Sequence, residues 1–220
     1  MRYTFSRQRR DAGFTIIELL IATLVFSVIL LIVTGGIMAF TRTYDKGINE
    51  TNTQTAARNI LGNISQAVQF SSAVNGFVGP LKTTGSPASR AFCVNNTRYS
   101  YLLGYEVEDT FNGSLHQSPH ALVVDNVPSC SVADSAQDLA AGTLDTGSQE
   151  LLGPHMRLAN LSVVQETFVA PQTFLISVNV VYGDDDLLKN PTAPNASCNG
   201  GTGSEFCASA SLSALVEKRL

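Results

Sequence analysis

The sequence has no proline before Pro80, although eight prolines occur in its 220 residues. Proline stops helices because it lacks an amide hydrogen and its ring clashes with the preceding turn. Charge is also scarce near the N-terminus, since Glu18 is the only charged side chain between Phe14 and Phe40. Such an apolar run is longer than the ~20 residues that a helix needs to cross a bilayer. It is also longer than the roughly 7–15-residue apolar core of a secretory signal.

The sequence also lacks features that enzymes and nucleic-acid-binding proteins need. Residues 1–13 contain four arginines and one aspartate, so removing them from 14 basic and 18 acidic residues leaves 10 and 17, a net charge of −7. A chain this acidic gives no support for general nucleic-acid binding. There is no Gly-x-Ser-x-Gly nucleophile motif, and Gly200–Gly203 lacks the strand and helix that flank a phosphate-binding loop. We therefore expect neither enzymatic activity nor a cofactor.

The apolar run 14–40 predicts a membrane helix, and the arginines before it place its N-terminal flank in the cytoplasm. Glu18 is unusual there, because a carboxylate inside a bilayer segment costs about 2.5–3.5 kcal/mol and usually marks a function. It follows Phe14 by four residues, so both side chains lie on one face of a helix. Cleavage between Gly13 and Phe14 would create an α-amino group within reach of this carboxylate or of a neighbour's.

These residues carry a family resemblance. A basic leader ending in Gly13, followed by Phe14, Thr15, Glu18, Leu19 and a long apolar run, resembles the class III signal of type IV prepilins and type II secretion pseudopilins. The resemblance implies cleavage after Gly13, N-methylation of Phe14 by prepilin peptidase, and assembly into a filament in which Glu18 sets the register between subunits. It also implies three kinds of partner: other pilin or pseudopilin subunits, the peptidase, and an inner-membrane assembly platform.

The segment 41–72 is polar but keeps helical periodicity, because Ile60, Ile64 and Val68 recur every fourth residue. It predicts an amphipathic continuation of the same helix, with one face ready to pack on a globular domain. The pair Gly35-Gly36 interrupts the apolar half. Two alternatives stay open for this pair: a soft point in the helix, or close helix packing in the membrane.

Residues 73–220 predict a β-rich head. Apolar alternation and turn residues mark six runs as strands: Ala91–Val94, Arg98–Val107, Ala121–Val127, Leu158–Phe168, Thr173–Tyr182 and Cys207–Val216. Asn112-Gly113 predicts a tight turn, and the segments 129–154 and 183–205 predict loops that leave the sheet. A long helix followed by strands predicts an α+β fold, in which the amphipathic half-helix packs across an antiparallel meander. This architecture is similar to the pilin fold that the resemblance implies.

The four cysteines, Cys93, Cys130, Cys198 and Cys207, all follow the predicted membrane helix. That orientation places them outside the cytoplasm, where disulfides persist. Of three possible pairings, the short Gly- and Ser-rich loop favours Cys198–Cys207, which leaves Cys93–Cys130. A metal site is the alternative, but the sequence has no C-x-x-C spacing and no histidine near these cysteines.

Other candidate metal ligands are weak. Asp184, Asp185 and Asp186 could offer oxygens to Ca²⁺, but three adjacent aspartates cannot easily face one ion, so we expect a solvated acidic turn without calcium. His116 and His120 have a spacing that would suit a metal on a helix. Gly113 and Pro119 predict a loop instead, so both histidines are expected at the surface, with His155 distant from them.

The size and layout are most similar to a minor pilin or pseudopilin, of the PilW-like or J-type kind. The main hypothesis is a structural subunit of a type IV pilus or of a related type II secretion or DNA-uptake filament. It would be anchored in the cytoplasmic membrane with an extracytoplasmic head, and later lie in an extracellular or periplasmic filament. The alternative is a binding or adhesion module at the tip of such a filament.

Overall fold

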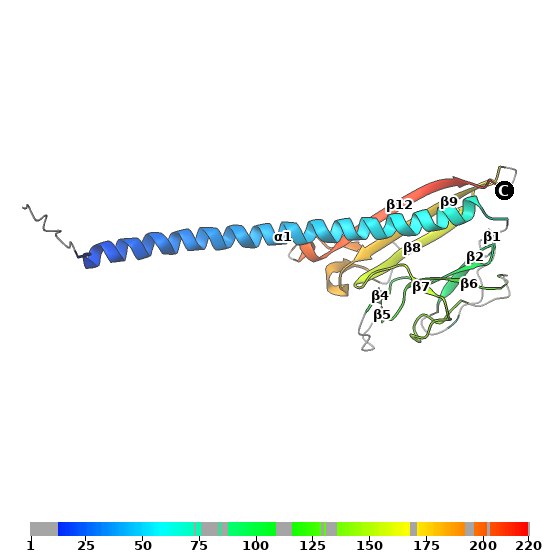
Figure 1. The fold of residues 1–220 in the computed structure, drawn as a ribbon, viewed down its shortest axis with the longest axis horizontal. Helices are drawn as coiled ribbons and strands as arrows, with labels where there is room; N and C mark the ends of the chain where they lie inside the picture. The colour runs from blue at the N-terminus through cyan, green and yellow to red at the C-terminus, as the bar shows by residue number, and fades with distance from the viewer. Residues whose placement is uncertain are drawn as a thin grey trace, which may run out of the picture. The chain divides into compact units, whose positions relative to one another are not determined.

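The computed structural model describes residues 13–72, 74–75, 84, 88–108, 116–128, 130, 136–167, 171–191, 196–201 and 203–219. The rest of the predicted leader, residues 1–12, and the predicted turn at Asn112-Gly113 lie outside these ranges. The chain divides into two units, Met1–Thr43 and Tyr44–Leu220. The helix α1 (Ile16–Gln69) contributes to both, and all strands belong to the second (Figure 1).

In the first unit, the described residues after Thr15 form one uninterrupted helix. Its few hydroxyls bond to carbonyls of the preceding turn, as in Ser27 Oγ to Thr23 O and Thr34 Oγ1 to Leu30 O, both 2.7 Å. Polar side chains are thereby satisfied without water, as a bilayer requires. The helix continues through Gly35 and Gly36, where a Cβ would meet nothing within 4 Å.

In the second unit, α1 buries one narrow stripe of side chains against the sheets. The buried positions recur every three or four residues, which is the spacing of one helix face: Thr53, Ala57, Ile60, Ile64 and Val68. The predicted amphipathic segment therefore packs through the residues that its periodicity identified.

The strands form two five-stranded sheets and one small ribbon. The first sheet has the order β1 (Val74–Asn75), β2 (Arg90–Val94), β3 (Thr97–Tyr101), β6 (Leu122–Asn126) and β7 (Gln149–Glu150), and is antiparallel throughout. The second has the order β12 (Ala208–Glu217), β9 (Thr173–Tyr182), β8 (Met156–Gln165), β4 (Glu106–Val107) and β5 (Gln117–Ser118). Within it only β4 and β5 are parallel. The ribbon joins β10 (Leu188–Lys189) to β11 (Ser197–Cys198).

The α+β class is thus confirmed, but the single antiparallel meander is wrong. The predicted strand Arg98–Val107 is two strands, β3 and β4, in different sheets. The chain changes sheet at Leu102–Gly104, where Leu102 N donates to Ala121 O (2.8 Å) and Gly104 N donates to Leu158 O (3.0 Å). Gly104 has a φ of +79°, a conformation that glycine adopts without steric cost.

The predicted loops contain more structure than expected. The segment 129–154 supplies β7 to the first sheet. The segment 183–205 holds β10, β11, the 3₁₀ turn Asp185–Leu187 and part of the turn Ser204–Phe206. Neither segment is therefore a simple excursion, although residues 129, 131–135, 192–195 and 202 lie outside the described ranges.

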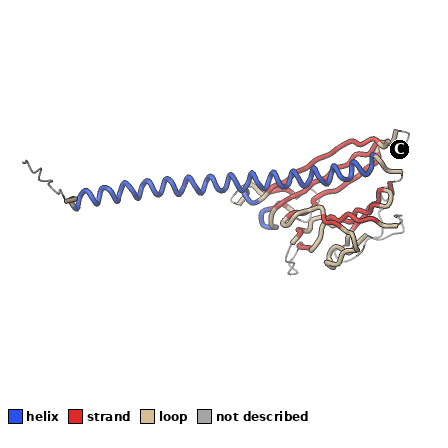
Figure 2. Tube along the Cα trace, viewed as in Figure 1, coloured by secondary structure: helices blue, strands red, loops and turns tan. Residues whose placement is uncertain are grey.

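Hydrogen bonds join the second half of α1 to both sheets. From the first sheet, Tyr99 donates its hydroxyl to Asn63 Oδ1 at 2.6 Å, and burial raises the pKa of Tyr99 to about 12. Beside β12, Asn49 Nδ2 donates to Glu205 O (3.3 Å) and Arg219 N donates to Gln69 O (3.0 Å). These two bonds show that β12 runs alongside α1 in the same direction (Figure 2).

Candidate functional site

The start of α1 is a capping box built from Thr15 and Glu18. Glu18 Oε2 accepts bonds from the Thr15 amide (2.9 Å) and hydroxyl (2.8 Å), while the Glu18 amide donates to Thr15 Oγ1 (3.3 Å). A threonine at the cap and a glutamate three residues later satisfy amides that the first helical turn leaves unpaired. Glu18 therefore has a structural task in the uncleaved chain, and this local role was missed although the Thr-x-x-Glu spacing signals it.

The predicted cleavage site lies just before this cap. Gly13, Phe14 and Thr15 are non-helical, and Phe14 is 86% exposed. A Cβ added at Gly13 would meet nothing within 4 Å. The Gly13–Phe14 bond thus lies in non-helical, exposed backbone of the kind that proteases cut.

The helix after the cap exposes an unbroken apolar surface. Its large hydrophobic residues from Ile16 to Phe40 are 48–83% exposed. The best 18-residue window of α1 has a mean hydropathy of 3.0, so the helix is long and apolar enough to cross a membrane. Contiguous apolar surface of this extent requires lipid or other protein around it.

The comparison with known families agrees with this geometry. Residues 8–34 match the family model of the prokaryotic N-terminal methylation motif. The chain carries a prepilin-type N-terminus. The match covers the last six residues of the leader, the Gly13–Phe14 bond, the capping box and most of the apolar helix. No curated protein and no solved structure was found to match the chain.

The prepilin motif supports a pilin- or pseudopilin-type subunit of a type IV filament. It suggests processing by prepilin peptidase and assembly with other pilin subunits. A membrane-anchored protein fits both the motif and the apolar half of α1.

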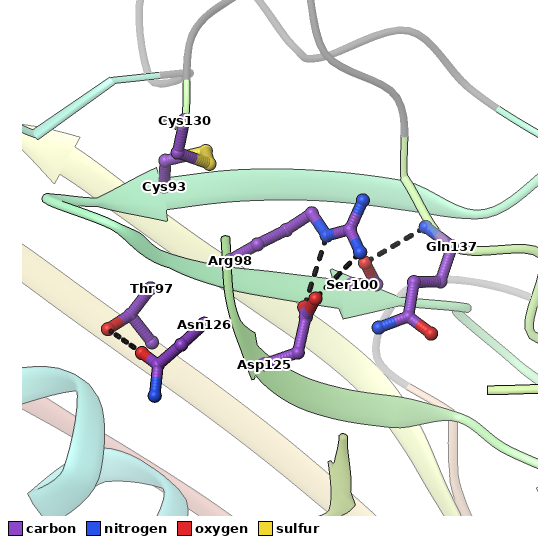
Figure 3. The surroundings of a disulfide bond; sticks show 8 residues. All are labelled: Cys93, Thr97, Arg98, Ser100, Asp125, Asn126, Cys130 and Gln137. Carbon is purple, nitrogen blue, oxygen red and sulfur yellow. Dashed lines mark hydrogen bonds and ion pairs between the residues drawn. A yellow bond between two sulfur atoms is a disulfide. The ribbon is translucent and has the colours of Figure 1, made fainter. Parts of the chain in front are cut away.

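The cysteines pair as favoured from the sequence, Cys93 with Cys130 and Cys198 with Cys207. Figure 3 shows the first bridge beside the ion pair of Arg98. Arg98 donates to both oxygens of Asp125, from Nε at 3.1 Å and from Nη2 at 2.7 Å. Gln137 N also donates to Ser100 Oγ at 3.1 Å, so the segment around residue 137 is held against β3. These contacts hold parts of the head together.

The acidic triplet is only partly the solvated turn expected. Asp184 and Asp186 are exposed, but Asp185 pairs with Arg157 and lies 3.0 Å from His116 Nδ1. His116 and His120, which were expected at the surface, are partly exposed there: their side chains are 26% and 23% exposed, and each faces a carboxylate. The three aspartates do not converge on one point, as expected for adjacent residues.

A denser cluster lies where β4, the start of β8 and the end of β9 meet. His155 Nδ1 is 2.9 Å from Glu106 Oε1, 3.4 Å from Glu108 Oε1 and 3.8 Å from Asp184 Oδ1. Glu106 is buried, and its other oxygen accepts from Arg157 Nη2 at 2.9 Å. Arg157 is itself fully buried and also donates to Gly183 O at 3.0 Å.

The protonation of this cluster departs from ordinary values. Burial raises the pKa of the Glu106 carboxyl to about 7, although the hydrogen bond from His155 and the charge of Arg157 act in the opposite direction. The hydrogen bond to Glu106 raises the pKa of His155. Sequence reasoning placed only Asp184 here, because the other members come from distant segments.

Proposed function

We propose that this chain is a minor pilin or pseudopilin, cleaved after Gly13, methylated on Phe14, and assembled through α1 with its head outside the cytoplasm. The observation that carries the proposal is the capping box at the start of a helix whose large apolar side chains from Ile16 to Phe40 are exposed. We also propose that the role is structural and not catalytic. In support of this, all four cysteines are in disulfides and offer no free thiol nucleophile.

The proposed mechanism gives Glu18 two successive tasks. Before cleavage, Glu18 Oε2 accepts hydrogen bonds from the amide and from the hydroxyl of Thr15. After cleavage, the new α-amino group of Phe14 of this subunit or of a neighbour supplies a cation for the carboxylate. A subunit out of register would leave that charge unpaired at low dielectric, which is costly. The apolar side chains of the helix are buried both in lipid and in the filament, so their burial does not favour one register over another. The charge pair therefore sets the register.

The test is Glu18→Gln, because glutamine also serves in a capping box but carries no charge. We expect Glu18→Gln to insert, to be cleaved and to be methylated normally, and to enter filaments at least tenfold less often than the unmodified subunit. Intact-mass analysis measures loss of residues 1–13 and gain of one methyl group, and immunoblotting of sheared filaments measures incorporation.

The matched control is Glu50→Gln, since Glu50 is an acid on the same helix outside the apolar half, half-exposed and 4.0 Å from Lys46. Equal incorporation of the Glu18 and Glu50 variants would contradict the register mechanism. A purified filament subunit that keeps residues 1–13 would contradict the proposed processing.

A second candidate, a binding module at the filament tip, is supported by a groove of ≈ 440 Å³ between α1 and the first sheet. Its walls combine amide and aromatic side chains, which suit a polar ligand: Asn63, Gln66, Phe70, Tyr99, Asn126 and Gln149. Changing Gln66 and Gln149 to alanine tests this role. Loss of adhesion or uptake with normal filament number would support a tip module, and unchanged adhesion would exclude this groove.

A further inference from the structure

Three side chains that are far apart in the sequence bring their donor atoms together in the head. Glu106 comes from β4, His155 precedes β8 and Asp184 follows β9, and their ligand atoms all lie within 4.8 Å of one another. The Glu108 carboxylate reaches the same imidazole nitrogen. One nitrogen and two carboxylate groups therefore lie close to one another, and a third carboxylate, that of Glu108, approaches the nitrogen.

The spacing fits a small tetrahedral cation. Zinc binds nitrogen and oxygen ligands at about 2.0–2.2 Å, which places neighbouring ligand atoms of a tetrahedron about 3.4 Å apart. The distances from His155 Nδ1 to the three carboxylate oxygens are 2.9, 3.4 and 3.8 Å and bracket that value. Calcium is a poorer fit, because it takes six to eight oxygen ligands and this cluster offers a nitrogen.

The surroundings hold these ligands in place. Arg157 Nη2 donates a hydrogen bond to Glu106 Oε2, and the other carboxylate oxygen, Oε1, faces the His155 imidazole. Two backbone hydrogen bonds hold His155 in place. Its N–H donates to Val107 O of β4 (2.9 Å), and its carbonyl accepts from Gly183 N just after β9 (3.0 Å). Such outer contacts orient metal ligands in proteins.

An opening leads to the cluster. A cavity of ≈ 190 Å³ adjoins it, with walls formed by His155, Tyr182, Gly183, Asp184, Leu187 and Phe206. His155 and Asp184 are 48% and 69% exposed, so an ion can enter from solvent and a water molecule can complete its coordination.

We propose that Glu106, His155 and Asp184, with Glu108 beside them, bind one zinc-like divalent transition-metal ion in the head. The ion would join β4, the start of β8 and the end of β9, and so stabilise the second sheet. This role is separate from filament assembly through α1.

The experiment titrates Zn²⁺ into the detergent-solubilised full chain after removal of metals by a chelator, with calorimetry and thermal unfolding as readouts. We expect one Zn²⁺ per chain, a raised melting temperature, and no comparable effect of Ca²⁺. His155→Asn should weaken Zn²⁺ binding about 100-fold, and asparagine tolerates the positive φ of 58° at this position.

The matched control is His116→Asn, because His116 also has a positive φ, of 62°, and also faces a carboxylate. It should bind Zn²⁺ normally. Asp184→Asn, at an exposed position, is a second variant that should weaken binding without unfolding the head. The proposal is overturned if the unmodified chain takes up no Zn²⁺, or if His155→Asn and Asp184→Asn both bind as well as His116→Asn.

Discussion

At the scale of single residues, the chain uses charge sparingly and places it where a partner is built in. Glu18 is held by Thr15 at the helix start, and Arg98 is held by two oxygens of Asp125. Arg157 is the most buried of these groups, with Glu106 and Asp185 on either side. Removing the partner of such a buried charge leaves it unpaired, which destabilises the folded state.

Arg157→Ala should therefore destabilise the head strongly. It would leave the buried Glu106 carboxylate without its cation, and breaking a buried pair from one side costs about 3–5 kcal/mol. Thermal unfolding of the β-sheet signal by circular dichroism measures the effect. Arg58→Ala, at an exposed position of α1, is the control and should change stability by less than about 0.5 kcal/mol. Equal melting temperatures for the two variants would contradict this account.

At the scale of elements, local patterns predict what one segment does but not which segment it meets. The spacing of Ile60, Ile64 and Val68 predicted the buried stripe of α1, and the predicted strand Thr173–Tyr182 coincides with β9. The break between β3 and β4 was missed because the alternation continues through Leu103 and Tyr105, and Gly104 was the one local signal of it. The break depends on long-range bonds to Ala121 and Leu158.

The candidate sites divide in the same way. The prepilin motif is contiguous, so the sequence could identify Gly13, Phe14 and Glu18 directly. The cluster of Glu106, His155 and Asp184 forms only after β4, β8 and β9 are in place. No spacing along the chain links those three residues, which is why the sequence showed His155 only as distant from His116 and His120.

Docking of α1 on the sheets should depend on its buried stripe. Ile60→Ala removes a fully buried side chain and leaves a cavity, so we expect a loss of about 2–5 kcal/mol. The matched control is Ile48→Ala on the same helix, where the side chain is 40% exposed and the loss should be much smaller. Denaturant unfolding followed by tyrosine fluorescence compares them. A larger loss for Ile48→Ala would show that the stripe is assigned to the wrong face.

At the scale of the whole molecule, the two units solve opposite problems. The apolar side chains of the first unit are exposed, and the second buries a core drawn from α1 and both sheets. The first unit therefore depends on lipid or neighbouring subunits, while the second is stabilised by its own packing and two disulfides. Removing lipid or neighbouring subunits from the first unit should therefore leave the structure of the second unit unchanged.

The two disulfides should contribute unequally to stability. They close loops of different length, with sequence separations of 37 and 9 residues. The chain-entropy relation gives about 3.8 kcal/mol for the longer loop and about 2.6 kcal/mol for the shorter. Replacing Cys93 and Cys130 by serine should therefore lower the melting temperature more than replacing Cys198 and Cys207. The reverse order would show that loop closure does not control their effect.

The direction of β12 has a mechanical consequence. Glu205 and Arg219, which lie just before and just after β12, are bonded to α1, so the strand runs beside the helix. The strand also pairs with β9 over ten residues. A pull along this part of α1, as when a subunit is drawn out of the bilayer, would load the β12–β9 ladder in shear. The backbone hydrogen bonds between the two strands would then bear the load together, instead of breaking one after another from one end.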